Sequence, residues 1–489
     1  MKFPLLFILI PFVAFGQIQI GQTIDGEAEG DLFGTNVSIS SDGNVIAIGA
    51  FDNDGNGINS GHVRIYENQG GTWTQIGQDI DGEAIGDLSG TSVSLSCNGR
   101  IVAIGASNNN NNKGHVRIYQ NNNNSWTQIG QDIDGSAAQR FFGRSVSLSC
   151  DGNTVAIGSN INIANNPVSG QVGVYRNQNN NWVRIGNNIN DAVSANVLGT
   201  VVSLSDNGST VAIGTPFDVG DGVLSGNVRV FKNQGESWVQ IGNDITSEMV
   251  GDQFGRELSL SGDGTVIAIS SLVDGVDENN QIGEVRIYKD EGVNWEQIGT
   301  NIVGEMPGDQ FGRGLSLSTN GNIVAIGARL NDNDNGISSG HVRVFQFQND
   351  LWRQIGNDID GEMPGDQSGI SVSLSDNGSI VAIGSNLSNG GKGHVRIFDL
   401  SDTLLTVKEE QSITSRFKLF PNPAPSNVTI ELPEEQAIVI QDITMYNSLG
   451  QRVLSTNETI INTSQFPKGI YIVQIRTAEG IASKKLIVD

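Results

Sequence analysis

Residues 92–130 read SVSLSCNGRIVAIGASNNNNNKGHVRIYQNNNNSWTQIG and hold four short segments of β-strand character, separated by runs of Asn, Gly and Ser. Residues 92–96 alternate small polar and apolar side chains, whereas residues 101–106 are continuously apolar or small. Residues 115–119 alternate again, and residues 126–130 begin with a tryptophan. Four such strands in one unit predict a blade of a β-propeller, with the apolar second strand buried between neighbouring blades.

This unit repeats along the chain. All six tryptophans begin the motif Trp-x-Gln/Arg-Ile-Gly, at spacings of 53, 56, 56, 57 and 57 residues. An Asp-Gly or Asn-Gly pair follows each first strand and supplies the positive φ of a tight hairpin. These pairs are Asp42-Gly43, Asn98-Gly99, Asp151-Gly152, Asn207-Gly208, Asp263-Gly264, Asn320-Gly321 and Asn377-Gly378. Seven turns in a fixed period predict an all-β, seven-bladed propeller.

The seventh unit ends at residues 394–398 without the tryptophan motif. The missing strand is at the other end of the chain, because residues 17–21, QIQIG, reproduce residues 75–77, QIG, in register. We therefore expect the N-terminal strand to complete the last blade, so that the ring has no open sheet edge. The predicted propeller spans residues 17–400.

The two ends of the chain predict export. Residues 1–16 combine Lys2 with an apolar run and place Ala14 and Gly16 before a cut at Gln17, as in a secretory signal peptide. No other stretch approaches the roughly 18 apolar residues of a membrane helix, so we expect no transmembrane segment in the mature chain. Residues 401–416 are the predicted linker to a separate domain over residues 417–489.

Composition limits the partners. Lys and Arg total 28 against 53 for Asp and Glu, a net charge of −25 that repels polyanions, so we expect no nucleic acid partner. The only two cysteines, Cys97 and Cys150, occupy the same position in successive units. Export permits a disulfide between them. Two free thiols in turns are the alternative, because equivalent positions in adjacent blades can lie beyond bonding reach.

The repeat resembles the FG-GAP repeats of integrin-type propellers. The resemblance rests on Phe33-Gly34 leading to Gly49-Ala50 and on Phe311-Gly312 leading to Gly327-Ala328, and it covers residues 18–398. That family carries a calcium loop between the first two strands, whereas this chain has a bare Asp-Gly or Asn-Gly turn there. We do not carry the family's calcium site over.

Residues 417–489 resemble the type A sorting domain of the type IX secretion system of Bacteroidota. The resemblance rests on Pro421-Asn422-Pro423, residues 445–451 (MYNSLGQ), residues 469–473 (GIYIV) and residues 484–488 (KKLIV). By themselves these residues predict a small Ig-like β-sandwich. The resemblance implies a type IX secretion partner for this domain and a final location that is secreted or on the outer cell surface.

Two loops after the second strand are candidate calcium sites. Asp52 and Asp54 in the first unit, and Asp332 and Asp334 in the sixth, place carboxylates two residues apart among amide oxygens, as a hard cation prefers. Solvated turns are the alternative. The four histidines, His62, His115, His341 and His394, precede the same strand in four units, so we interpret them as scaffold residues that cannot converge on one metal.

No catalytic residues and no cofactor site stand out. The tryptophans are expected to pack between blades rather than bind sugars. We therefore expect a non-enzymatic, exported propeller that binds a protein or a glycan. The alternative is an exported hydrolase or lyase acting on polysaccharide, which would need paired carboxylates unique to one blade. Units three and four depart from the acidic series before the first strand, at residues 136–140 and 192–197, and would mark the sector of the rim specialised for a ligand; drift within the repeat is the alternative.

Overall fold

The structure is a computed structural model of the chain, and it describes residues 17–136, 141–159, 170–190, 199–216, 225–235, 237–247, 251–272, 282–404, 417–431, 440–447, 451–477 and 480–488. The chain divides into two compact units, Met1–Leu400 and Ser401–Asp489. The predicted signal peptide, residues 1–16, and most of the predicted linker lie outside the described residues.

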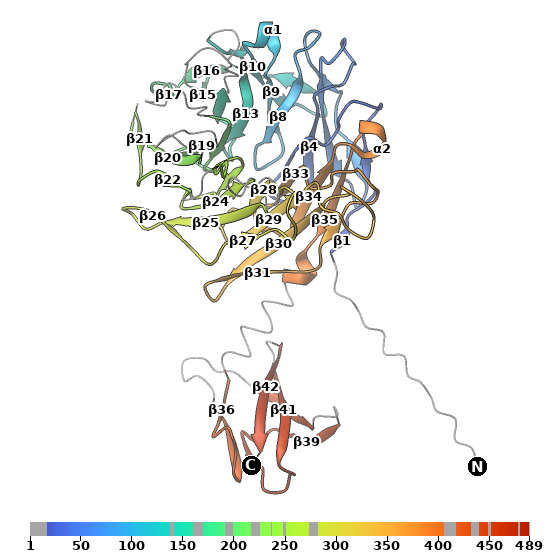
Figure 1. The fold of residues 1–489 in the computed structure, drawn as a ribbon, viewed down its shortest axis with the longest axis vertical. Helices are drawn as coiled ribbons and strands as arrows, with labels where there is room; N and C mark the ends of the chain where they lie inside the picture. The colour runs from blue at the N-terminus through green and yellow to red at the C-terminus, as the bar shows by residue number, and fades with distance from the viewer. Residues whose placement is uncertain are drawn as a thin grey trace, which may run out of the picture. The chain divides into compact units, whose positions relative to one another are not determined.

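The first unit is an all-β propeller, as the sequence predicts. Its described residues form seven five-stranded antiparallel sheets around a common axis (Figure 1). Each sheet contains four strands from the axis outward and one two-residue strand that pairs with the third strand. The short turns α1 (Asn109–Asn112) and α2 (Ser388–Gly391) follow the second strands of the second and seventh sheets.

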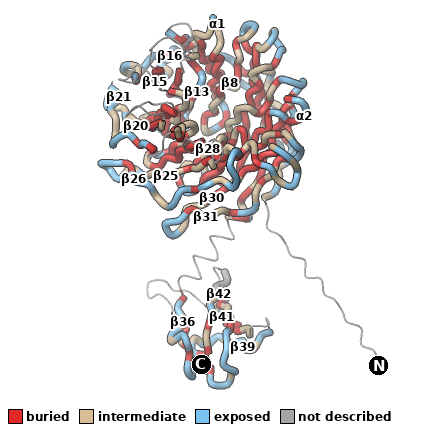
Figure 2. Tube along the Cα trace, viewed as in Figure 1, coloured by how far each residue is buried: buried red, intermediate tan, exposed pale blue. Residues whose placement is uncertain are grey.

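The first and second strands of each sheet lie nearest the axis. The first strands are β3 (Asn36–Ile39), β8 (Ser89–Leu95), β13 (Phe142–Leu148), β18 (Val201–Leu204), β23 (Leu258–Leu260), β28 (Phe311–Leu317) and β33 (Ser371–Leu374). The second strands are β4 (Val45–Ala50), β9 (Ile101–Ala106), β14 (Thr154–Ser159), β19 (Thr210–Thr215), β24 (Val266–Ser271), β29 (Ile323–Ala328) and β34 (Ile380–Ser385). The second strands are almost wholly buried, which explains their unbroken apolar sequence (Figure 2).

The third strands are β5 (His62–Asn68), β10 (His115–Asn121), β15 (Gln171–Gln178), β20 (Asn227–Asn233), β25 (Glu284–Asp290), β30 (His341–Gln348) and β35 (His394–Asp399). The fourth strands are β6 (Trp73–Gln75), β11 (Trp126–Gln128), β16 (Asn181–Arg184), β21 (Trp238–Gln240), β26 (Trp295–Gln297), β31 (Leu351–Gln354) and β1 (Ile18–Gln19). The two-residue strands are β7 (Ile80–Asp81), β12 (Ile133–Asp134), β17 (Ile189–Asn190), β22 (Ile245–Thr246), β27 (Ile302–Val303), β32 (Ile359–Asp360) and β2 (Ile24–Asp25).

The ring is closed by the N-terminal segment. Strand β1 pairs antiparallel with β35, with Ile18 opposite Asp399 and Gln19 opposite Phe398. The last sheet therefore combines residues from both ends of the unit, and its fourth strand covers what would otherwise be a free edge.

Each tryptophan joins two neighbouring blades. The indole N–H of every one donates to the backbone carbonyl of an isoleucine in the preceding blade, at 2.8 to 3.3 Å. Five of the six are at most 9% exposed, and Trp238 is less deeply buried. The tryptophans pack between blades, as expected. At the interface that closes the ring, Gln17 lies beside Gly356. At other interfaces between blades, a tryptophan lies beside the equivalent glycine.

Two belts of hydrogen bonds surround the axis. In the first belt, a serine hydroxyl of each inner strand accepts a backbone N–H from the next blade at 2.9 to 3.1 Å. These seven serines are Ser38, Ser94, Ser147, Ser203, Ser259, Ser316 and Ser373. The small polar residue in each Ser-x-Ser segment is thereby explained, because seven strands converge there and their backbone donors need acceptors.

The second belt, which we call the turn ring, is made of backbone alone. The residue before each Asx-Gly turn donates its N–H to the carbonyl of the same residue in the next blade, at 2.9 to 3.1 Å, around the full circle. Its members are Ser41, Cys97, Cys150, Asp206, Gly262, Thr319 and Asp376. Cys97 and Cys150 are neighbours in this ring, their Cα atoms are 4.6 Å apart, and they form a disulfide. Of the two interpretations left open by the sequence, the bridge is the one observed.

The second unit is a two-sheet β-sandwich. One sheet contains β36 (Lys418–Phe420), β37 (Asn427–Glu431) and β40 (Ile460–Asn462). The other contains β38 (Ile440–Asn447), β39 (Arg452–Thr456), β41 (Gly469–Thr477) and β42 (Gly480–Val488). The two sheets share one apolar core that includes Phe417, Met445 and Tyr471.

Candidate functional site

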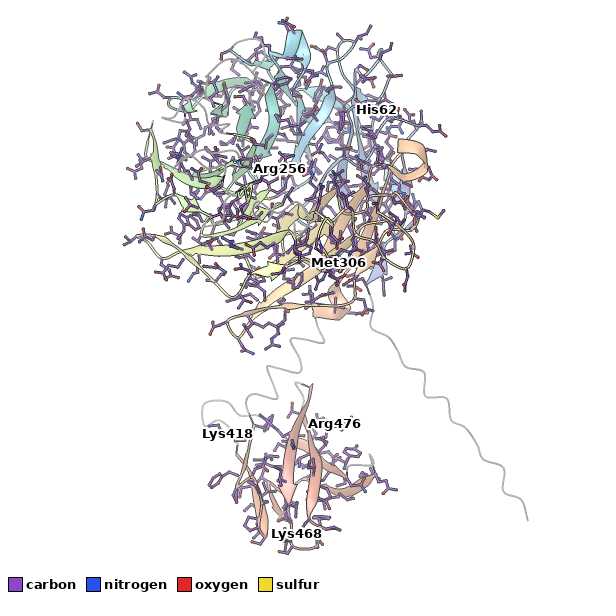
Figure 3. All side chains as sticks on the ribbon, in the orientation of Figure 1. His62, Arg256, Met306, Lys418, Lys468 and Arg476 are labelled. Atoms are coloured by element: carbon purple, nitrogen blue, oxygen red, sulfur yellow. A yellow bond between two sulfur atoms is a disulfide. The ribbon has the colours of Figure 1, made fainter. Side chains whose placement is uncertain are left out.

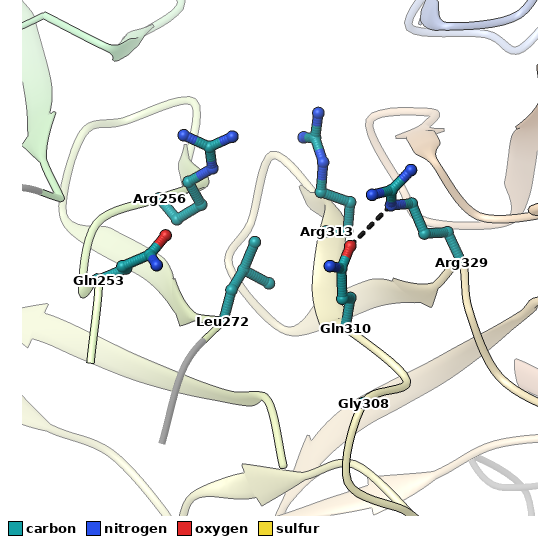
Figure 4. Close-up of a pocket in the computed structure, with 7 residues that line it drawn as sticks. All are labelled: Gln253, Arg256, Leu272, Gly308, Gln310, Arg313 and Arg329. Atoms are coloured by element: carbon teal, nitrogen blue, oxygen red, sulfur yellow. Dashed lines mark hydrogen bonds between the residues drawn. The ribbon is translucent and has the colours of Figure 1, made fainter. Parts of the chain in front are cut away.

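The inner strands run from one end of the axis to the other, so the end opposite the turn ring carries their first residues. A cavity of about 460 Å³ lies on the axis there, and the first halves of inner strands from all seven blades contribute to its lining. A side recess of about 280 Å³ adjoins it and shares three lining arginines with it (Figure 4). We call this end of the axis the mouth.

In each blade, the residue directly after the glycine at the start of the inner strand lines this cavity. At the seven equivalent positions the chain has Thr35, Thr91, Arg144, Thr200, Arg256, Arg313 and Ile370. Arginine therefore replaces threonine in the third, fifth and sixth blades. A fourth arginine, Arg329, reaches the same space from the end of β29 (Figure 4). Figure 3 places Arg256 near the centre of the ring of sheets.

Two of the four arginines are held by neighbours. Arg313 forms an ion pair with Glu257 at 2.5 Å. Arg329 donates to the side-chain oxygens of Gln310 and Gln367 at 2.7 and 2.6 Å, so its partners are neutral. In the part of the chain that the structure describes, the side chains of Arg144 and Arg256 have neither an ion-pair nor a hydrogen-bond partner.

The arginine charges act on one another. Burial lowers the pKa of Arg144, and the positive charge of Arg313 lowers it further. The same two causes, in the same order, lower the pKa of Arg256, and the negative charge of Glu257 opposes the shift in both residues. Burial and the charges of Arg313 and Arg256 lower the pKa of Arg329. Guanidinium groups stay protonated in proteins, so the result is a concentrated positive charge within the cavity.

None of these arginines was predicted from the sequence as a site residue, although three of them directly follow the Phe-Gly pairs of their units. The available signal was the repeat itself, because Arg144, Arg256 and Arg313 share one register position in three units while other units have threonine there.

The predicted calcium residues lie in loops that are held by their own hydrogen bonds. Asp54 accepts the backbone N–H of Asn59 at 2.8 Å, and Asp332 accepts that of Ser338 at 2.8 Å. Asp52 accepts the side-chain amide of Asn59 at 3.3 Å, and burial followed by the charges of Asp54 and Asp31 raises its pKa. Asp334 is exposed in the second loop. Calcium binding at these four residues stays a prediction.

The histidines do not converge, but three of them have carboxylates beside them. Among the described residues, three groups can each offer one histidine and two carboxylates to a metal ion: Glu27, His62 and Asp79; Glu83, His115 and Asp132; Glu305, His341 and Asp358. In each histidine the pKa is lowered, chiefly by burial, so the ring is neutral at physiological pH.

An arginine stands in each of these three groups. Arg64 contacts Glu27 and Asp79, Arg117 lies 3.5 Å from Glu83, and Arg343 lies 3.8 Å from both Glu305 and Asp358. The His-Val-Arg sequence puts histidine and arginine two residues apart, on the same face of the third strand. The guanidinium balances one of the two carboxylate charges, so each group keeps a net negative charge and remains able to offer its ligands to a cation.

Comparison with known families agrees with this architecture. Residues 418–489 match the model of the secretion system C-terminal sorting domain. The C-terminal unit is a type IX sorting domain. The residues that identify it are structural: Asn422 donates to the carbonyl of Lys485 at 2.8 Å and accepts the N–H of Ile487 at 2.9 Å, which ties the Pro-Asn-Pro segment to the last strand. The sorting domain indicates export to the cell surface or beyond.

Residues 23–66 match the FG-GAP repeat model. Among solved structures, the chain is similar to a putative 6-phosphogluconolactonase from Bacteroides uniformis, with 14% identity, a TM-score of 0.47, and coverage of 68% of this chain and 86% of that one. It is also similar to the periplasmic gluconolactonase of Pseudomonas aeruginosa, with 14% identity, a TM-score of 0.43, and coverage of 70% and 93%. No curated protein matches the chain. None of the described helices is long and apolar enough to span a bilayer.

Proposed function

We propose that this chain is an exported, non-catalytic binding protein that takes part of an extracellular ligand, a glycan or a protein, into the axial cavity. One observation carries the proposal: the lining of the cavity differs from blade to blade at positions where the fold itself requires no difference. A concave site with a few convergent polar groups is where a ligand is expected. The sorting domain supports a ligand outside the cell.

The cavity favours binding over catalysis. Hydrolysis of a glycosidic bond uses two carboxyl groups in separate roles. Among the described residues that line the cavity, Glu257 is the one carboxylate, and its partner is Arg313. We therefore prefer a binding protein to the alternative, a hydrolase or lyase acting on polysaccharide.

The proposal can be tested by filling the cavity. Thr200→Trp places a large side chain at a position where three other blades already carry arginine, so the fold should accommodate it. The full chain and this variant are compared in a binding screen against glycans and surface proteins, with Val239→Trp on the exposed outer strand β21 as the matched control.

We expect Thr200→Trp to abolish binding and Val239→Trp to leave it unchanged. Binding that survives Thr200→Trp would place the site elsewhere and contradict the proposal. Turnover of a bound polysaccharide by the unmodified chain, with loss of turnover in Thr200→Trp, would establish the enzymatic alternative instead.

A further inference from the structure

The mouth is positively charged, whereas the protein as a whole is strongly negative. The chain has a net charge of −25, yet its axial cavity gathers Arg144, Arg256, Arg313 and Arg329 around a single carboxylate, Glu257. These arginines come from three blades and line one cavity because their inner strands converge on the axis. Figure 4 shows three of them, Arg256, Arg313 and Arg329, around the adjoining recess. In an acidic protein such a concentration of positive charge needs a physical reason.

Stability is not that reason. Like charges that are taken partly out of water repel each other and lose hydration, and both effects oppose folding. Glu257 pairs with Arg313 and also attracts Arg144 and Arg256, but one carboxylate cannot balance four guanidinium groups. Among the described residues, the side chains of Arg144 and Arg256 have no ion-pair or hydrogen-bond partner, and Arg329 is held only by neutral amides. An anion placed between them would be attracted by all of them. Guanidinium groups bind carboxylate, sulfate and phosphate through paired N–H donors.

The rest of the wall indicates what kind of anion. Threonine, serine and asparagine side chains alternate with the arginines around the cavity, among them Thr35, Asn36, Thr91 and Ser145. Thr35 and Thr91 donate their hydroxyl hydrogens to the carbonyls of Leu32 and Leu88, so their oxygens remain as acceptors for a ligand that carries several hydroxyl groups. Apolar residues such as Val37, Phe51 and Ile370 also line the wall, and they offer packing surface for the carbon skeleton of a sugar ring.

The size and the overall charge limit the ligand further. A cavity of about 460 Å³ that ends above the serine belt has room for one or two sugar rings. A long polyanion lying across the face would be repelled by the net negative charge.

We propose that the mouth is an anion subsite for an acidic sugar, a hexose-sized unit carrying a carboxylate, sulfate or phosphate group, with Arg144 and Arg256 as its principal charged contacts. This inference rests on the proposed function and names its ligand class. The acidic group would lie between the arginines, and the hydroxyl groups would contact the threonine and asparagine side chains.

The test uses substitutions that the repeat itself supplies. Arg144→Thr and Arg256→Thr introduce the residue that three other blades carry at the same position, so both variants should fold. Arg256→Lys keeps the charge but not the paired donors. Arg100→Thr removes one positive charge from an exposed turn at the opposite end of the axis and is the matched control.

Isothermal titration calorimetry would measure galacturonate, a sulfated galactose and a phosphorylated galactose against neutral galactose, inorganic sulfate and a hexa-aspartate peptide. We expect at least one acidic sugar to bind, and neutral galactose not to bind. Each arginine-to-threonine change should lower the affinity about tenfold or more, since it removes a charge-assisted hydrogen bond. Arg256→Lys should lose less, Arg100→Thr should lose nothing, and affinity should fall with added salt.

The possible failures are distinct. A neutral ligand that is blocked by Thr200→Trp but unaffected by Arg144→Thr and Arg256→Thr would overturn this inference and leave the proposed function standing. A hexa-aspartate peptide that binds more tightly than every acidic sugar would overturn the sugar assignment. Equal affinity of inorganic sulfate and the sulfated sugar would show that the hydroxyl groups make no contact, which also contradicts it.

Discussion

The two ends of the propeller axis are built in opposite ways. At the turn ring and the serine belt, each blade contributes the same contact, a backbone pair or a serine hydroxyl, and the side chains are small. At the mouth, equivalent positions hold threonine in three blades, arginine in three and isoleucine in one. The serine belt repeats one side chain because the fold uses its hydroxyl, and the turn ring tolerates different side chains because its contacts are made by backbone alone. The mouth differs from both because its variable positions gather one kind of charge around a cavity.

The tryptophans test the repeated side of this comparison with the largest effect. Trp126 is 3% exposed and its N–H donates to Ile76 at 2.8 Å, so Trp126→Ala should cost roughly 3–5 kcal/mol of unfolding free energy. Trp238 is less buried and its hydrogen bond is longer, at 3.1 Å, so Trp238→Ala should cost less.

Urea unfolding followed by tryptophan fluorescence would measure both variants. All six tryptophans lie in the propeller, so the signal excludes the sorting domain. Equal costs at the two positions would show that the burial difference has no energetic meaning. A negligible cost for Trp126→Ala would contradict the packing role.

The disulfide is the next largest contribution. It closes 53 residues within the turn ring, and loop-closure entropy gives a stabilisation of about 2–4 kcal/mol. The double variant Cys97→Ser, Cys150→Ser introduces the residue that the first blade has at this position, Ser41, so the backbone ring can persist without the bridge.

Compared with the unmodified, disulfide-bonded chain, both this double variant and the chemically reduced chain should have a lower unfolding midpoint, and the two decreases should be equal. A midpoint that falls only on reduction, and not in the double variant, would indicate an effect of the reductant rather than of the bridge.

Much of the fold was predictable because it depends on local patterns repeated seven times. The Asx-Gly turns, the apolar second strands and the Trp motif each fix one feature of every blade, and glycines such as Gly43 and Gly99 have the positive φ, 73° and 65°, that their turns require. The mouth was not predictable in the same way. Arg144 and Arg313 are far apart in the sequence, and only closure of the ring brings their charges together.

The predicted metal residues illustrate the same limit. Asp54 and Asp332 match a calcium pattern in sequence, but their backbone contacts within the loops could not be read from residue order. The carboxylates beside the histidines were also missed, because Glu83 and Asp132 come from different segments on either side of His115.

A single serine tests the belt with a smaller effect. The hydroxyl of Ser203 accepts the backbone N–H of Leu260 from the next blade at 3.0 Å. Ser203→Ala removes that acceptor and leaves a buried donor without a partner, which should cost about 1–3 kcal/mol. Ser125→Ala, at an exposed position in the propeller, is the control. If urea unfolding shows no difference between Ser203→Ala and the unmodified propeller, the belt does not stabilise the ring.

The smallest expected effect has the opposite sign and separates the two ends most directly. Arg256→Thr removes a guanidinium that has no ion-pair or hydrogen-bond partner among the described residues. The change relieves repulsion from Arg313 and Arg144, which is larger than the attraction of Glu257 that is lost with it. We expect the free energy of unfolding to stay unchanged or to rise by less than about 0.5 kcal/mol. Added salt should shrink the gain, because screening weakens the same repulsion in the unmodified chain. If Arg256→Thr instead destabilised the propeller as much as Ser203→Ala, the arginine would be part of the scaffold, and the contrast between a structural end and a ligand-binding end of the axis would fail.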